Sequence, residues 1–205
     1  MAFIRSTFYF ILLFFGSCSE TPNVEKVPIA KRVVPRQSLL SQKTNEKKKL
    51  SEYEFFKSPI AELIPNVNVY SYDVNTPLFS DYASKKRFVF LPKDSQMEFS
   101  QIENTLRFET GSILIKNFYY PISKNEERII ETRLLIKEKE GWKPLNYIWN
   151  TEQTDASLNY IGADIEVEWM NSHEEIQKVN YSVPNQNQCK NCHISGSEIT
   201  PIGLT

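Results

Sequence analysis

The chain has 205 residues, with 24 lysines and arginines against 25 aspartates and glutamates, so its formal net charge is −1. This balance provides no electrostatic field that would draw nucleic acid to the surface, so we expect no nucleic-acid partner. Aromatic residues make up 13% of the chain, which is enough for the core of one domain of ordinary size.

The first 17 residues have the features of a bacterial signal peptide. Arg5 supplies the positive charge, and an apolar run of eight residues follows at 8–15. This run is too short for a transmembrane helix, which needs about 20 residues. Small residues then precede Cys18, which resembles a bacterial lipobox and predicts lipidation of Cys18 as the first residue of the mature chain. The alternative is ordinary signal-peptide cleavage nearby, with Cys18 unmodified.

Residues 18–49 are predicted to form a flexible tether after the lipidated cysteine. They are polar, and the first part of the segment carries three prolines with little apolar periodicity. Such a composition cannot bury enough apolar surface to become ordered. Folded structure is expected from Leu50, where Ser51 and Glu54 match the capping box of a short helix that Ser58-Pro59 ends.

A β-rich domain is predicted over residues 50–184. Apolar residues alternate with polar ones in several runs, and turn residues separate these runs. The expected strands lie at 67–72, 86–91, 113–120, 128–137, 142–149, 165–169 and 179–183. Around seven strands with few helical stretches predict a mainly β fold, either an antiparallel β-sandwich or a barrel-like sheet.

Residues 189–193 read C-K-N-C-H, the most specific motif of the chain. Two residues between the cysteines allow both thiols to reach the two vinyl groups of one haem, and His193 follows as the proximal ligand of the iron. Cys189, Cys192 and His193 are therefore the predicted haem c site. A structural zinc half-site is disfavoured, because zinc needs four ligands and only His173 remains as another histidine. Two alternatives stay open, namely a redox dithiol, which would be expected beside a βαβ pattern, and a motif left unoccupied.

Four charged residues, namely Asp81, Glu131, Arg133 and Asp155, could line a pocket. No feature of the sequence places any two of them within reach of one substrate, so no catalytic residue is assigned. For Glu131 and Arg133 the favoured interpretation is cross-strand ion pairs on a face of the sheet. An enzyme is therefore the weaker expectation.

Five stretches of the chain carry a resemblance to known proteins: PLFSDYASKKRFVFLP (77–92), KNFYY (116–120), ETRLLI (131–136), YIWNTEQTDA (147–156) and YSVPNQNQCKNCH (181–193). Together they resemble a family of exported bacterial c-type cytochrome proteins, in which a β-rich N-terminal region precedes a haem-binding segment. The resemblance runs from about Leu50 to the end. It implies haem attachment at Cys189 and Cys192 and ligation by His193.

The same resemblance implies that PIGLT (201–205) matches an early point of the family's cytochrome region. Only twelve residues follow His193, and none of them is methionine or histidine. The segment 185–205 is therefore expected to be the start of a haem region, in a family member that looks cut short. His173 and Met170 could supply a second axial ligand, but we expect His173 in an exposed polar turn and Met170 in packing.

The expected function is electron transfer by an exported lipoprotein that carries haem c. Its lipid anchor would hold it to a membrane, facing the periplasm or the cell surface. Its expected partner is a redox protein, such as an exported dehydrogenase. The alternative is a β-rich binding or docking module whose haem segment is vestigial or truncated.

Overall fold

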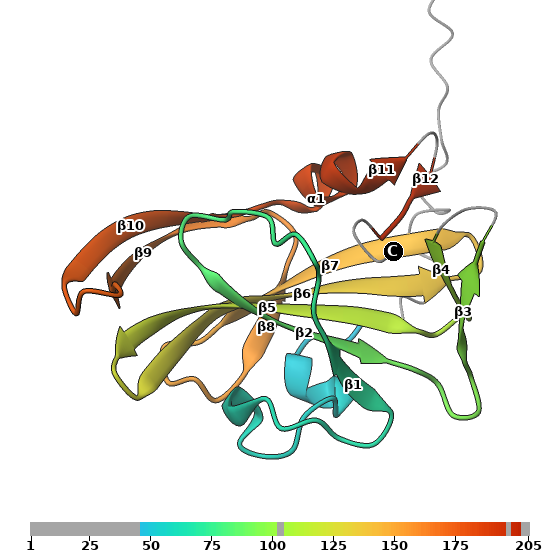
Figure 1. Ribbon diagram of the computed structural model, residues 1–205, viewed down its shortest axis with the longest axis horizontal. Helices are drawn as coiled ribbons and strands as arrows, with labels where there is room; N and C mark the ends of the chain where they lie inside the picture. The colour runs from blue at the N-terminus through green and yellow to red at the C-terminus, as the bar shows by residue number, and fades with distance from the viewer. Residues whose placement is uncertain (1–45, 102–104, 196–197, 202–205) are drawn as a thin grey trace, which may run out of the picture. The chain divides into compact units, whose positions relative to one another are not determined.

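The computed structural model describes residues 46–101, 105–195 and 198–201 (Figure 1). The predicted signal peptide, the predicted lipidation site Cys18 and the tether up to residue 45 lie outside the described residues. In the part that the structure describes, no helix is both long and apolar enough to cross a membrane.

A six-stranded sheet forms the centre of the described domain. Its strands follow the order β1 (Val69–Tyr72), β2 (Ser84–Phe90), β5 (Ile113–Ser123), β6 (Glu126–Glu138), β7 (Gly141–Trp149) and β8 (Ala156–Asn159). All neighbouring strands are antiparallel, and β1 and β8 are the edges. The prediction of a mainly β, antiparallel fold is confirmed.

Three hairpins accompany this sheet. They are β3 (Met97–Ser100) with β4 (Thr105–Phe108), β9 (Ala163–Met170) with β10 (Ile176–Val183), and β11 (Ile194–Ser195) with β12 (Glu198–Ile199). All seven predicted strands are present. The sequence did not reveal β3, β4, β8, β11 and β12, because strands of two to four residues are too short to show an alternating pattern.

The segment before β1 covers one face of the central sheet. It contains two 3-10 helices, η1 (Leu50–Tyr53) and η2 (Ile60–Glu62), on one side of the sheet in Figure 1. The buried side chains Phe55 and Phe56 of this segment pack against a row of apolar residues on the sheet. That row follows the strand register and consists of Phe88, Ile115, Leu134 and Leu145.

The predicted capping box at Ser51 and Glu54 is wrong. The Ser51 hydroxyl donates a hydrogen bond to the Asp155 carboxylate at 2.7 Å, and Glu54 has a left-handed backbone with φ of 56°. Residues 46–49, which composition placed in the tether, also contact the domain. The Lys143 ammonium lies 2.6 Å from a Glu46 carboxylate oxygen, and Lys49 pairs with Ser157 in an isolated β-bridge.

The opposite face of the sheet is covered at two places. Under the β9–β10 hairpin, Phe118 and Tyr120 of β5 pack with Tyr181 and other buried residues. Near the β3–β4 hairpin, Leu114 and Leu135 pack with buried aromatic residues. Figure 1 shows the helix α1 (Gln186–His193) on the same side of the sheet as β9 and β10. The cleft described next has its floor between these two clusters and extends over Leu114 and Leu135.

Candidate functional site

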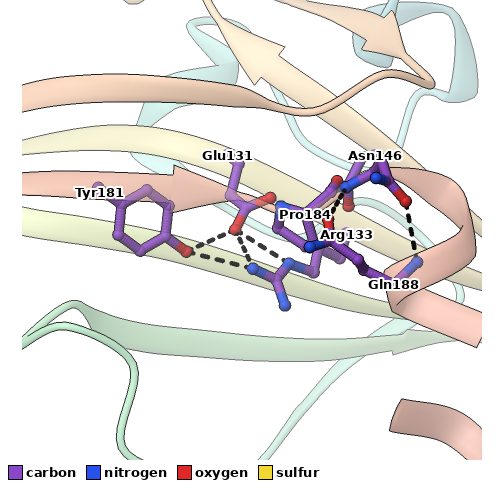
Figure 2. A network of polar contacts seen from close by, with 7 residues as sticks. Glu131, Arg133, Asn146, Tyr181, Pro184 and Gln188 are labelled. Atoms are coloured by element: carbon purple, nitrogen blue, oxygen red, sulfur yellow. Dashed lines mark hydrogen bonds and ion pairs between the residues drawn. The ribbon is translucent and has the colours of Figure 1, made fainter. Parts of the chain in front are cut away.

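Helix α1 carries the C-K-N-C-H motif, and its first turn is fixed by a complete capping box. The Asn185 side chain accepts a hydrogen bond from the Gln188 amide at 2.9 Å, and the Gln188 side chain accepts one from the Asn185 amide at 2.8 Å. The preceding Pro184 carbonyl accepts a hydrogen bond from the Asn146 side chain of β7 at 2.8 Å, as Figure 2 shows. These contacts attach the start of α1 to the sheet. The helix is absent from the sequence-based expectations, although Asn185 and Gln188 match a capping box.

The helix places the three motif side chains on one side. Cys189, Cys192 and His193 are separated by three and four positions, a spacing that brings side chains to one face of a helix. All three line one cleft, and both cysteines are free thiols, Cys189 buried and Cys192 exposed. Burial raises the pKa of the Cys189 thiol, and the nearby Arg133 guanidinium offsets this only in part.

The imidazole of His193 is oriented by the chain that follows α1. Its Nδ1 lies 3.0 Å from the carbonyl oxygen of Thr200, and the Thr200 amide in turn donates to the His193 carbonyl at 2.7 Å. Because a carbonyl oxygen can only accept, Nδ1 carries the proton, and in the neutral ring Nε2 keeps its lone pair. Histidines that bind metals typically donate their other ring N–H in this way. The site therefore presents Nε2 as a free ligand atom.

The cleft that receives these side chains has a volume of about 790 Å³. Ligand pockets in proteins usually measure about 300–1,000 Å³. The cleft volume lies within this range and can hold a group of the size of a porphyrin. The floor is formed by β2, β5, β6 and β7, and α1 and the segment 72–80 complete the wall. Most of the wall is apolar, and its large side chains include Tyr72, Leu78, Phe79, Leu114 and Leu135.

Three cations, Arg87, Lys116 and Arg133, lie side by side on the cleft floor. The strand register pairs Arg87 of β2 with Lys116 of β5, and Lys116 with Arg133 of β6. We call these three residues the cationic row. Like charges directly opposite each other on neighbouring strands destabilise a sheet. The arrangement is therefore not explained by the stability of the empty fold.

Arg133 is held by a buried acid, shown in Figure 2. Glu131 is fully buried, and its Oε1 accepts hydrogen bonds from the Arg133 guanidinium, with Nε at 2.9 Å, and from the Tyr181 hydroxyl. The expected ion pair thus exists, but the expected cross-strand geometry is wrong. Glu131 and Arg133 are two positions apart on β6, where alternation places their side chains on the same face.

The other predicted candidates lie away from the cleft. Asp155 accepts hydrogen bonds from Ser51, and Asp81 contributes its backbone carbonyl to the Tyr120 hydroxyl. His173 is exposed in the turn between β9 and β10, as predicted, and Met170 is the half-buried last residue of β9. None of these four residues lines the cleft. Among the described residues of the wall, His193 is the only histidine, and no methionine is present.

Comparison with known proteins gives no match: no family model, no curated protein and no solved structure is similar to this chain. Within residues 46–101, 105–195 and 198–201, no group of three or more histidine, cysteine, aspartate or glutamate side chains is placed to hold a metal ion. A function for the chain is therefore inferred from the geometry of the motif and the cleft.

Proposed function

We propose that the chain is a c-type cytochrome-like electron-transfer protein that binds haem covalently through Cys189 and Cys192, with His193 as an axial ligand of the iron. The observation that carries this proposal is that both thiols and the imidazole line the same cleft. The size and apolar wall of the cleft, and the free Nε2 of His193, also support it. Membership of the exported c-type cytochrome family is part of the same proposal.

Each residue has a separate task in this site. The Cys189 and Cys192 thiols would hold the haem by adding across its two vinyl groups. Each addition would form a sulfur–carbon bond, turn the carbon–carbon double bond into a single bond and move the thiol hydrogen to the other carbon. No electrons are gained or lost in this addition. The two thioethers prevent loss of the cofactor, and the hydrogen bond to Thr200 fixes the orientation of the His193 ring. Bound haem supplies a one-electron iron couple, whose potential depends on the axial ligand and on burial.

The absorption spectrum of the purified chain tests this proposal. Expressed in a host with a cytochrome c maturation system, the protein should be coloured and have a high-spin ferric spectrum. After reduction it should bind carbon monoxide readily, because the described cleft wall offers no second histidine and no methionine. A correctly exported but colourless protein would refute haem binding and favour the docking-module alternative. A low-spin spectrum would contradict the ligand assignment.

We also propose that the protein is exported and anchored to a membrane through a lipid on Cys18, where it exchanges electrons with a redox partner such as an exported dehydrogenase. The Cys18→Ala variant should lose lipid attachment and membrane association, or accumulate as an uncleaved precursor. Fractionation of cells with immunoblotting measures both effects. Processing and membrane association equal to those of the wild type would argue against lipidation at this residue.

A further inference from the structure

The cationic row carries more positive charge than the described residues around it neutralise. Arg133 has the fully buried partner Glu131. Among the residues that the structure describes, Arg87 pairs only with Asp73, whose side chain is 86% exposed, while the Arg87 side chain is 7% exposed. Because Asp73 is solvent-exposed, water screens its charge, and it compensates the buried Arg87 guanidinium only in part. Part of the Arg87 charge is therefore available to a further anion.

Lys116, at the centre of the row, has no carboxylate partner within ion-pair distance among the described residues. Its ammonium instead lies 4.9 Å from the centre of the Phe118 ring. Burial, with the neighbouring charges of Arg133 and Arg87, lowers the pKa of Lys116 to about 8. The amine is still mostly protonated at pH 7. A half-buried cation between two other cations is costly unless a ligand supplies negative charge.

An apolar row lies beside the cationic row on the same floor. This apolar row lies two positions away from the cationic row along each strand. The register pairs Leu114 of β5 with Leu135 of β6, and Leu135 with Pro144 of β7. All three residues line the cleft. The floor therefore has an apolar part and a cationic part, next to each other. This division matches an amphiphilic ligand that has a flat apolar body and carboxylates on one edge, which is the chemistry of a porphyrin.

We propose that Lys116 and Arg87 form a carboxylate-binding site that takes the two propionate groups of the haem. This inference rests on the proposed function, since it assigns the orientation of the same cofactor in the same cleft. Charge-assisted hydrogen bonds to carboxylates are among the stronger polar contacts in proteins. The site would hold the carboxylate edge of the porphyrin at the cationic row, and the apolar body over Leu114 and Leu135.

Metal-free protoporphyrin IX and its dimethyl ester distinguish carboxylate recognition from iron ligation and from thioether formation. The apoprotein, expressed without a maturation system, is titrated with each porphyrin, and quenching of tryptophan fluorescence gives the dissociation constant. We expect the wild-type chain to bind the dicarboxylate about tenfold more tightly than the ester, because the ester cannot accept charge-assisted bonds of the same strength. Equal affinities for the two porphyrins in the wild type would overturn the inference.

Three variants locate the site. Lys116→Met and Arg87→Gln should each reduce the preference for the dicarboxylate to about twofold or less, while affinity for the ester stays close to that of the wild type. Lys86→Met is the matched control, because Lys86 lies next to Arg87 on β2, pairs with Glu127 and does not line the cleft. It should keep the tenfold preference. A variant that lost its fold would bind neither porphyrin, so ester binding reports on folding.

The result of the porphyrin titrations can be distinguished from the result of the test for covalent haem binding. Covalent haem on the cysteines, without a preference for the free acid, would leave the function standing and remove this inference. A preference that persists in Lys116→Met and Arg87→Gln would place the carboxylate contacts elsewhere and would also overturn it. Loss of the preference in both variants, with Lys86→Met unchanged, would establish the site.

Discussion

Replacing both Cys189 and Cys192 with alanine should abolish covalent haem attachment in a maturation-competent host. No other cysteine is present among the described residues, so no thioether can form in the cleft. The β-rich domain should remain folded, because neither cysteine belongs to the three buried clusters that join the sheet to its covering elements. Haem-dependent peroxidase staining after denaturing electrophoresis measures the result, since only covalently bound haem survives denaturation.

Matched variants make this experiment specific. Lys190→Ala changes a residue between the two cysteines that does not line the cleft, and it should stain like the wild type. Each single cysteine variant retains one thioether and should stain more weakly. Staining of the double alanine variant at the intensity of the wild type would show that haem is attached elsewhere, and would remove the assigned roles of both cysteines.

The Glu131→Ala variant should lose about 3–5 kcal/mol of folding free energy, the usual effect of removing one partner of a buried ion pair. Glu131 is fully buried, and three donors from Arg133 and Tyr181 converge on its Oε1 (Figure 2). Its removal leaves a guanidinium on a half-buried side chain and a buried phenol without their acceptor. Denaturant unfolding, followed by tryptophan fluorescence, measures the change.

Two variants calibrate this effect. Glu131→Gln keeps an oxygen acceptor for Tyr181 but removes the charge, so it should be less destabilising than Glu131→Ala. Glu127, on the same strand as Glu131, forms an ion pair with Lys86 of β2 in which both side chains are at least 40% exposed. The Glu127→Gln variant breaks this pair. It should cost less than about 1 kcal/mol. A loss of similar size in Glu127→Gln and Glu131→Ala would mean that the buried network contributes nothing specific to stability.

The long strands could be predicted from the sequence because alternation over many residues leaves little ambiguity. The run 128–137 is β6 almost completely, with Glu126–Glu138 as its observed bounds. Capping patterns were less reliable. Ser51 and Glu54 match the pattern, but Asp155 from the turn after β7 binds the Ser51 hydroxyl and no capping contact forms. Asn185 and Gln188 have no such competitor, and there the box is complete.

The haem motif could be predicted directly from five consecutive residues. The cleft could not be predicted from the sequence. Arg87, Lys116 and Arg133 lie far apart in the chain and meet only through the register of three strands. A shift of one residue in any strand would turn its cation to the opposite face. Single-sequence reasoning does not fix the register, so the cationic row and its charge imbalance appear only in the folded structure.

The central claim is that one haem is joined to the chain through Cys189 and Cys192. A glutamate-specific protease releases the peptide Ile176–Glu198, which contains both cysteines and His193. After expression in a maturation-competent host, denaturation and digestion, mass spectrometry of this peptide tests the claim directly. We predict that its mass is increased by one haem, with both thiols blocked to alkylation. A peptide of unmodified mass, with two thiols that alkylate, would contradict the account.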